Sequence, residues 1–266
     1  PYLSGDGIAD AFHLSTGGVL LARRIVELLA GLLAKRGVDL LCGQAASVDP
    51  ARGALTLADG TRLQADLLVV AAGPWGPRLL PSLAPRVRAT RQIIVRLAAP
   101  PADAEAWTRA PMLLDLAEDG GFYAVPPVAG TPLKIGDHRF APHGDPEDSR
   151  DATPAEAEEI LAYARHRIRG LADYRVLSAA ACYYDVEPQE RFVVERLGDR
   201  GFVLSGFSGH GFKFGALLGL ALARAAGDES LGAAISGWAA GEAPPPAGWF
   251  ADSKQETTAG RCPPPP

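Results

Sequence analysis

The stretch that decides the fold is Gly206-Phe-Ser-Gly-His-Gly-Phe-Lys-Phe214, which places three glycines, a histidine and a lysine between an apolar run and a helical pattern. Val203 and Leu204 end the apolar run, and residues 215–226 have the composition of a helix. The first turn of such a helix directs backbone N–H groups and the positive end of its dipole at the group before it. The stretch therefore predicts a cradle for an electron-rich or anionic group. The alternative is a tight strand-to-helix turn with a solvated lysine.

A second informative run is Ala65-Asp-Leu-Leu-Val-Val-Ala-Ala-Gly73, which is apolar and has no helical period. This pattern predicts a buried parallel strand. Gly73 ends the run without a side chain to obstruct a dinucleotide. The alternative is an ordinary core strand of an α/β domain.

Two further segments, Pro132-Leu-Lys-Ile-Gly-Asp-His138 and Ala179-Ala-Ala-Cys-Tyr-Tyr184, complete a pattern. With the glycine stretch they resemble the monomeric sarcosine oxidase and N-methyl amino acid oxidase family, within the D-amino acid oxidase-like superfamily. The resemblance covers about residues 17–227. It implies an FAD-dependent enzyme that oxidises the C–N bond of an amino acid or N-methyl amino acid with O2, giving imine and hydrogen peroxide.

The resemblance also implies roles for individual residues. Cys182 matches the cysteine that carries FAD through a thioether, Lys213 the lysine that pairs with the substrate carboxylate, and Lys134 the lysine that activates oxygen. The other implied pocket residues are Tyr123, His138, Tyr184 and His210, the last beside the flavin. The other implied cofactor contacts are Gly73, Trp75, Gly209, Gly211 and Phe212.

Each of these residue types has a plainer interpretation. Lys134 alternates with Leu133 and Ile135, so its side chain points either into a pocket or into solvent. Cys182 alone fits a small core residue. Lys213 alone fits a surface lysine lying over neighbouring aromatic rings. His210 alone fits a loop histidine bonded to backbone groups.

Flavin oxidases of this kind begin with a strand, a Gly-x-Gly-x-x-Gly turn and a helix that hold the FAD pyrophosphate. This sequence lacks that unit, because Gly5-Asp-Gly7 has no third glycine and too few residues before it for a strand. The simplest interpretation is that the sequence is the later part of a longer protein and works with the missing N-terminal segment or a partner subunit. The alternative is a degenerate, non-catalytic module. Asp137 and the Tyr183–Tyr184 pair also depart from the family and predict a more polar or wider pocket.

Composition excludes several classes. A formal charge of -5 without a basic block argues against nucleic acid, and charged residues interrupt the longest apolar stretch, residues 19–33, which argues against a membrane span. Three cysteines at wide spacing argue against disulfides or zinc and favour the cytoplasm. The five histidines lack metal-ligand spacing. A hydrolase elbow would need glycine at position 210, where His210 stands.

The predicted fold is mixed α/β. Residues 1–88 and 186–240 form a partial, Rossmann-like FAD-binding domain, interleaved with an antiparallel substrate domain at residues 89–185. Expected elements include a packing helix over 17–36, a strand at 38–41, a hairpin over 55–63, strands from residue 91 onward and a capped helix over 153–169. The proline-rich segment 241–266 is predicted to be disordered.

Overall fold

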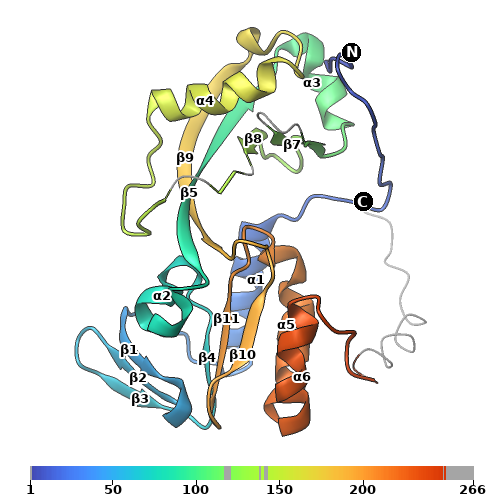
Figure 1. Ribbon diagram of the computed structural model, residues 1–266. Helices are drawn as coiled ribbons and strands as arrows, with labels where there is room; N and C mark the ends of the chain where they lie inside the picture. The colour runs from blue at the N-terminus through green and yellow to red at the C-terminus, as the bar shows by residue number, and fades with distance from the viewer. Residues whose placement is uncertain (1, 117–120, 138, 141–142, 248, 250–266) are drawn as a thin grey trace. The chain divides into compact units, whose positions relative to one another are not determined.

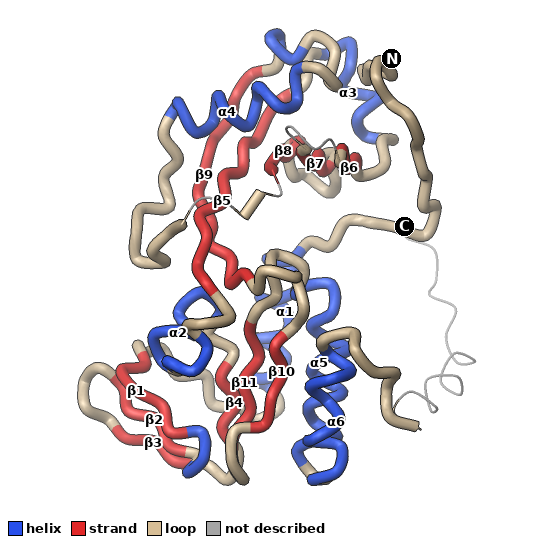
Figure 2. Tube along the Cα trace, viewed as in Figure 1, coloured by secondary structure: helices blue, strands red, loops and turns tan. Residues whose placement is uncertain are grey.

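The computed structural model describes residues 2–116, 121–137, 139–140, 143–247 and 249. The chain folds into two compact units (Figures 1 and 2). Unit 1 comprises Pro1–Leu41 and Ala89–Tyr184, and unit 2 comprises Cys42–Arg88 and Asp185–Pro266. Both units contain helices and strands, which confirms the predicted mixed α/β class.

Unit 1 is built on a five-stranded sheet in the order β6-β7-β8-β5-β9. Its strands are β5 (Arg88–Ala98), β6 (Leu113–Asp115), β7 (Phe122–Val125), β8 (Leu133–Asp137) and β9 (Arg175–Val186). The pairs β5–β8, β8–β7 and β7–β6 are antiparallel. The predicted antiparallel sheet after residue 91 is confirmed.

One face of this sheet forms the core of unit 1. Leu133 and Ile135 alternate along β8 and are both 0% exposed, because successive side chains of a strand point to opposite faces. They share a cluster with Trp107 of α3 (Pro101–Thr108) and Ile160 of α4 (Pro154–Arg165). In Figure 1, α4 lies along this sheet. The opposite face is left for the polar side chains of the alternating positions.

Helix α4 begins as its sequence predicts. The Thr153 hydroxyl accepts a hydrogen bond from the Glu156 N–H at 3.2 Å, and the Glu156 carboxylate accepts one from the Thr153 N–H at 2.7 Å. This reciprocal pair is a capping box, which satisfies two N–H groups at the start of the helix. The helix ends at Arg165, earlier than the predicted residue 169.

Helix α1 (Ala22–Lys35) confirms the predicted helix but not its packing. None of its residues is buried, and Leu28 and Leu29 are 74% and 52% exposed. The expectation of a packing helix is therefore wrong within the described part of the chain. An amphipathic pattern specifies the helix and its apolar stripe, but it does not supply the surface that covers the stripe.

Unit 2 holds two three-stranded sheets, in the orders β10-β11-β4 and β1-β2-β3. The strands are β1 (Ala45–Asp49), β2 (Ala54–Leu57), β3 (Arg62–Gln64), β4 (Leu68–Val70), β10 (Val193–Arg196) and β11 (Gly201–Ser205). The helices are α2 (Gly76–Leu79), α5 (Gly211–Ala226) and α6 (Glu229–Ala239). Short 3-10 turns are η1 (Pro50–Arg52), η2 (Gly73–Trp75) and η3 (Pro81–Leu83) here, and η4 (Leu171–Asp173) in unit 1.

Strand β4 pairs with β11 in parallel, which confirms the predicted parallel strand. The hairpin is also confirmed, since Leu55 lies opposite Leu63 and Gly60 adopts a φ of 88° in the turn. The strand predicted at 38–41 is wrong. Residues 38–41 are exposed and have no partner strand among the described residues, and an apolar run becomes a strand only where a partner accepts its backbone hydrogen bonds.

The start of α5 differs from the prediction. It begins at Gly211 rather than at Gly215, so Lys213 lies in the first helical turn. Gly211 has no positive φ, and a β-carbon there would lie 2.7 Å from the Phe207 ring. Glycine at this position leaves room for the Phe207 ring, and it does not interrupt the helix.

Helix α6 was not predicted. Asp228 caps it by accepting hydrogen bonds from the N–H groups of Ser230 and Leu231, a signal present in the sequence. It packs beside α5 (Figure 1), and Trp238 contacts Trp249 with 5.3 Å between ring centroids. Trp249 is 2% exposed although it lies within the segment predicted to be disordered. The prediction used the proline content of the segment, which does not show whether one large aromatic side chain is buried.

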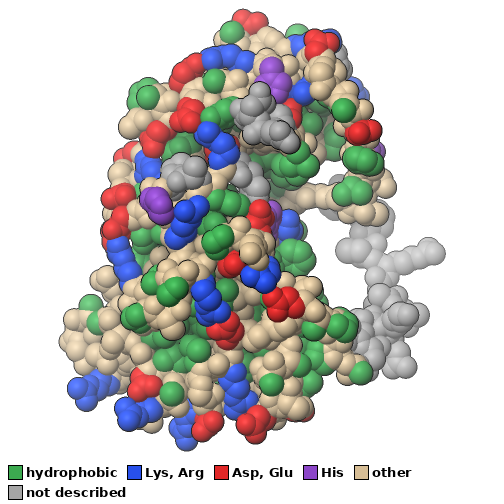
Figure 3. All heavy atoms as spheres, viewed as in Figure 1, with side chains coloured by type: hydrophobic (Ala, Val, Ile, Leu, Met, Phe, Trp, Pro, Cys, Tyr) green, Lys and Arg blue, Asp and Glu red, His purple; other side chains and the backbone are tan. Residues whose placement is uncertain are grey.

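The surface carries mixed charge. Figure 3 shows basic and acidic side chains interspersed over the face drawn. In the part of the chain that the structure describes, the search for a helix both long and apolar enough to span a bilayer finds none.

Candidate active site

One face of the unit 1 sheet positions Lys134 and Tyr123. The neighbours of Lys134, Leu133 and Ile135, face the core, so the Lys134 side chain lies on the opposite face. Tyr123 on β7 pairs with Gly136, two residues after Lys134 and thus on the same face. The Lys134 side chain is half-buried on this face.

The same face receives Cys182 and Tyr184 from β9. Ala181 faces the core, which turns Cys182 and then Tyr184 to the other side of the strand. The charges of Lys134 and Cys182 shift each other's pKa, as expected for near neighbours. We call the set Tyr123, Lys134, Cys182 and Tyr184 the polar sheet face.

Lys134 sits in a strongly cationic setting. Burial lowers its pKa, and the neighbouring Arg96 guanidinium lowers it further, whereas the Cys182 thiolate opposes the shift. Arg96 lies directly opposite Lys134 in the sheet, with Nη1 3.4 Å from the Ser178 hydroxyl. The Lys134 ammonium is also 5.5 Å from the centroid of the Tyr123 ring. Two cations on adjacent strands favour an anion, or developing negative charge, above this part of the face.

Cys182 is a free thiol in this setting. Its Sγ lies 3.6 Å from the Gln92 carbonyl oxygen, to which the thiol donates. Burial raises the pKa of Cys182, while the cations of Lys134, Arg150 and Arg96 lower it, so that the thiol form dominates at neutral pH. The cations give the electropositive surroundings that a nucleophilic cysteine needs, but burial outweighs them.

The two tyrosines form a hydrogen-bonded row with this cysteine. Burial raises the pKa of Tyr184 to about 12 and that of Tyr123 further still. The Tyr123 hydroxyl donates to Tyr184, which favours the Tyr184 phenolate, and the Tyr184 hydroxyl donates to Cys182. A β-carbon on Gly136 would lie 2.6 Å from the Tyr123 hydroxyl oxygen, so only glycine leaves room for the ring.

Three residues expected in the pocket have other outcomes. Asp137 alternates with Ile135 onto the core side of the sheet, where Arg139 Nε donates to its carboxylate at 2.8 Å. The Tyr183 hydroxyl accepts from Arg91 at 2.6 Å on that same side. Asp137 and Tyr183 therefore lie off the polar sheet face, and of the Tyr183–Tyr184 pair only Tyr184 lies on it. His138 lies outside the described residues.

In unit 2 the glycine stretch forms a strained loop. Gly206, Ser208 and Gly209 have φ values of 69°, 50° and 79°. Ser208 is 0% exposed, and its N–H donates to the Asp185 carbonyl at 3.0 Å. Helix α5 follows without a side-chain cap and without an acidic residue in its first turn. Its first N–H groups are therefore available for an electron-rich ligand, as a flavin ring requires.

His210 and Lys213 lie at the end of this loop. His210 Nε2 is 2.7 Å from the Glu190 carboxylate, and Lys213 Nζ is 3.4 Å from His210 Nδ1. Lys213 is exposed and the His210 side chain is 30% exposed. The His210 ring therefore contacts two charged side chains.

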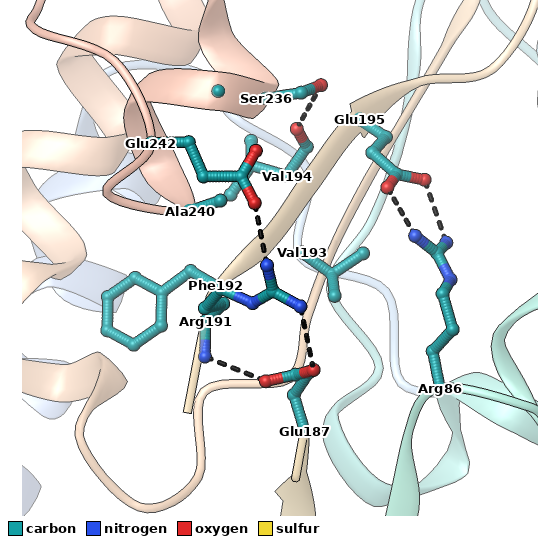
Figure 4. Close-up of a pocket in the computed structure, with 11 residues that line it drawn as sticks. Arg86, Glu187, Arg191, Phe192, Val193, Val194, Glu195, Ser236, Ala240 and Glu242 are labelled. Atoms are coloured by element: carbon teal, nitrogen blue, oxygen red, sulfur yellow. Dashed lines mark hydrogen bonds and ion pairs between the residues drawn. The ribbon is translucent and has the colours of Figure 1, made fainter. Parts of the chain in front are cut away.

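Acidic residues hold the loop in place. The Asp185 carboxylate accepts from the Gly206 N–H at 2.8 Å, and the Ser208 hydroxyl accepts from the Glu187 N–H at 3.1 Å. The Glu187 carboxylate accepts from the Arg191 N–H at 2.9 Å, as Figure 4 shows at the rim of a pocket of about 240 Å³. The charged groups of this pocket pair with one another.

Gly73 and Trp75 occupy the turn after β4. Gly73 has a φ of 51° and no atom within 4 Å of where a β-carbon would lie, so the backbone there is open to a close ligand. Trp75 ends η2 and is half-buried. The other implied cofactor contacts, Gly209, Gly211 and Phe212, lie in the glycine loop and at the start of α5 in the same unit.

Three contributors to these sites were not predicted: Arg96, Asp185 and Glu190. Side chains alternate along β5, so Arg96 lies on the face opposite to Val95 and Leu97. The sequence pattern could therefore have predicted the face on which Arg96 lies. Asp185 lies between Tyr184 and Val186 at the end of β9 and is buried, and a buried carboxylate needs a hydrogen-bonding partner. Glu190 reaches His210 only through a turn, and nothing in the sequence indicates it.

Comparisons with known proteins agree with this fold. The family model for DAO, FAD dependent oxidoreductase, matches residues 1–225. N-methyl-L-tryptophan oxidase from Yersinia pestis (strain Pestoides F) is 30% identical over 214 residues, which cover 79% of this chain and 55% of that protein. The same enzyme from Yersinia pseudotuberculosis serotype O:1b gives the same values.

Solved structures show the same fold at lower identity. A cysteine-pair mutant of Amadoriase I from Aspergillus fumigatus has a TM-score of 0.63 at 21% identity, covering 80% of this chain and 52% of that one. Fructosamine oxidase (Amadoriase II) from the same species has a TM-score of 0.54 at 19% identity, covering 76% and 48%. The chain spans about half the length of the curated relatives it matches. It belongs to the DAO family of FAD-dependent oxidoreductases.

Proposed function

We propose that this protein takes part in the FAD-dependent oxidation of the C–N bond of an amino acid or N-methyl amino acid, with O2 as acceptor and with imine and hydrogen peroxide as products. The observation that carries the proposal is the polar sheet face. Tyr123 and Lys134 lie on β7 and β8, far in the sequence from Cys182 and Tyr184 on β9, yet all four share one face of a sheet whose other face is core. In this proposal unit 1 contributes the substrate-binding domain, and unit 2 contributes FAD-binding residues.

FAD, when bound, supplies the acceptor for a hydride equivalent from the carbon next to the amine nitrogen. In unit 2, the residues that would hold it are Gly73, Trp75, Gly209, Gly211 and Phe212. The uncapped N-terminus of α5 stabilises negative charge near it. Lys213 in the first turn of α5 binds the substrate carboxylate by a charge-assisted hydrogen bond, with His210 beside it.

Lys134 has the oxygen role in this proposal. Reduction of O2 develops negative charge, and a half-buried ammonium stabilises that charge more than a solvated one. Arg96 adds a second cation beside it. Tyr123 and Tyr184 line the substrate pocket in this proposal, and the raised tyrosine pKa values keep both hydroxyls as neutral donors.

Cys182 is proposed as the position for covalent FAD. The proposal is supported by three surrounding cations that favour the thiolate, and it is opposed by burial, which raises the pKa of the thiol. Cys182 would have to lose its proton to bond covalently to FAD, and the three cations are the groups that would favour this loss.

We further propose that another segment of the protein, or a partner subunit, completes unit 2. Strand β4 has β11 on one edge and no strand on the other among the described residues, which leaves backbone groups able to pair. Val69 on this strand is 39% exposed. Apolar side chains are exposed along α5 as well, namely Phe212, Phe214, Leu217 and Leu220. The aligned region is only 55% of the N-methyl-L-tryptophan oxidase relative, so that relative has further residues that could cover such surfaces.

The decisive experiment compares this 266-residue chain with a version that includes any native upstream segment. Flavin absorbance is recorded before and after acid precipitation, and bleaching by N-methyl-L-tryptophan or sarcosine is followed without oxygen. Bleaching, followed by recovery when O2 is admitted, supports the oxidase. Flavin that stays in the acid pellet of the parent protein, but not in the pellet of the Cys182→Ser variant, supports covalent attachment. Absence of flavin from both proteins would overturn the proposal in favour of a degenerate, non-catalytic module.

A further inference from the structure

A three-residue chain of contacts ends at the proposed substrate-binding lysine. Glu190, His210 and Lys213 are joined by contacts of 2.7 Å and 3.4 Å through the two ring nitrogens of the histidine. An ammonium only donates, so His210 Nδ1 accepts from Lys213. When the ring is neutral and Nδ1 is the unprotonated nitrogen, the proton is on Nε2. The Nε2–H group then donates to the Glu190 carboxylate.

The contacts rest on unfavourable backbone conformations. Glu190 and Ser208 have φ values of 58° and 50°, in the left-handed region that residues with a β-carbon avoid. Glu190 lies in the turn between β9 and β10, where its N–H donates to the Glu187 carbonyl at 2.9 Å. The Glu187 and Ser208 main chains are linked through the Ser208 hydroxyl. Two strained loops are therefore fixed against each other, and the result is the alignment of Glu190 with His210.

We propose that Glu190 is a positioning residue, which acts through His210 to hold the Lys213 ammonium in the orientation that binds the substrate carboxylate. The inference rests on the proposed function for the identity of the ligand, but not for the contacts themselves. Strain kept at a turn without a glycine is typical of a functional constraint. Glycine would relieve the strain at position 190, and it would remove the carboxylate.

The test uses Glu190→Gly, because this substitution removes the carboxylate contact without a loss of stability from backbone strain. A glycine accepts the left-handed conformation without strain, so the melting temperature of the variant should equal or exceed that of the parent. Glu190→Gln is the second variant, since its amide oxygen still accepts from His210 without the charge. Glu242→Gln is the matched control, because that carboxylate pairs with Arg191 in the same unit.

The first measurement is proton NMR of the His210 ring, assigned with His210→Gln, on the whole chain. We expect an Nε2–H resonance slowed in its exchange with water, present in the parent and in Glu242→Gln and lost in Glu190→Gly. A resonance that persists in Glu190→Gly, or is absent from the parent, would overturn the proposed contact between Glu190 and His210. This outcome does not depend on flavin, so it stays distinct from failure of the proposed function.

The second measurement uses the flavin-loaded protein and a pair of amines, N-methyl-L-tryptophan and N-methyltryptamine, which lacks the carboxylate. Lost positioning should raise KM for the amino acid on the order of tenfold in Glu190→Gly, with kcat unchanged and with no change for the amine. Glu190→Gln should fall between this variant and the parent. The dissociation constant of indole-3-propionate, followed by flavin absorbance, should weaken in parallel. Equal effects on both amines would contradict the positioning role.

Discussion

The sharpest test of the polar sheet face is Gly136→Ala, because that position lies directly beneath the Tyr123 ring. A β-carbon there would be 2.6 Å from the tyrosine oxygen, 2.7 Å from Cζ and 3.0 Å from Cε1. Ordinary contact needs roughly 1 Å more, so the ring must retreat from its place. The retreat breaks the hydrogen bond from Tyr123 to Tyr184.

The magnitude follows from three terms. Overpacking a filled site costs about 1–3 kcal/mol, and here the lower half of that range applies because the obstructing atoms are the far end of one side chain. The lost tyrosine hydrogen bond costs about 1 kcal/mol. Replacing glycine by alanine within a strand gains about 0.5–1 kcal/mol. Gly136→Ala should therefore lower the free energy of unfolding by about 1–2 kcal/mol.

The assay is urea denaturation of a double-mutant cycle with Tyr123→Val, which removes the ring and keeps a strand-forming residue. In that background the alanine meets no ring, so its backbone gain remains and the sign of its effect should reverse to a stabilisation of about 0.5 kcal/mol. The coupling energy between the two sites should then be about 2 kcal/mol. An equal loss in both backgrounds would refute the claim that Gly136 exists to accommodate Tyr123.

Three further predictions concern charge. With the other cysteines replaced by serine, Lys134→Met should raise the pKa of Cys182 by removing a cation that favours the thiolate, and alkylation by iodoacetamide at about pH 8 should slow severalfold. In the flavin-loaded protein the same substitution should slow reoxidation by O2 at least about tenfold in stopped flow, and an unchanged rate would remove the oxygen role of Lys134. The Arg91 guanidinium holds the pKa of Glu156 at about 2, below its usual 4.5, so their ion pair stabilises the fold above pH 4.5 and loses this effect as pH falls toward 2. Glu156→Gln should cost about 1 kcal/mol at neutral pH after solvent screening, and clearly less at about pH 3 in urea titrations.

The elements of unit 1 could be predicted because their signals are local. Thr153 and Glu156 form the capping box that their spacing indicates, and the β-branched runs after residue 91 form the antiparallel sheet. The same alternation that places Lys134 on the polar sheet face also places Asp137 on the core side. That assignment was open to sequence reasoning, and resemblance to a pocket position led to the wrong side of the strand.

Other features depend on partners or on backbone conformations that the sequence does not show. The α1 pattern specifies a helix and an apolar stripe, but not what covers the stripe. The start of α5 depends on the Phe207 ring, which lies against Gly211 and leaves it helical. The contact of Glu190 with His210 spans 20 residues and requires positive φ at a glutamate, which no residue preference favours.

The two groups of site residues are therefore held in physically different ways. Lys134 and Tyr123 project from paired strands whose other face is fully buried, so a cooperative sheet fixes their positions. Lys213 projects from the first turn of a helix, and side chains on strained turns fix its ammonium. A substitution that moves the sheet residues must also disturb the core and lower stability. On the role proposed for Lys213, a substitution at Glu190 should therefore change carboxylate binding while stability is kept.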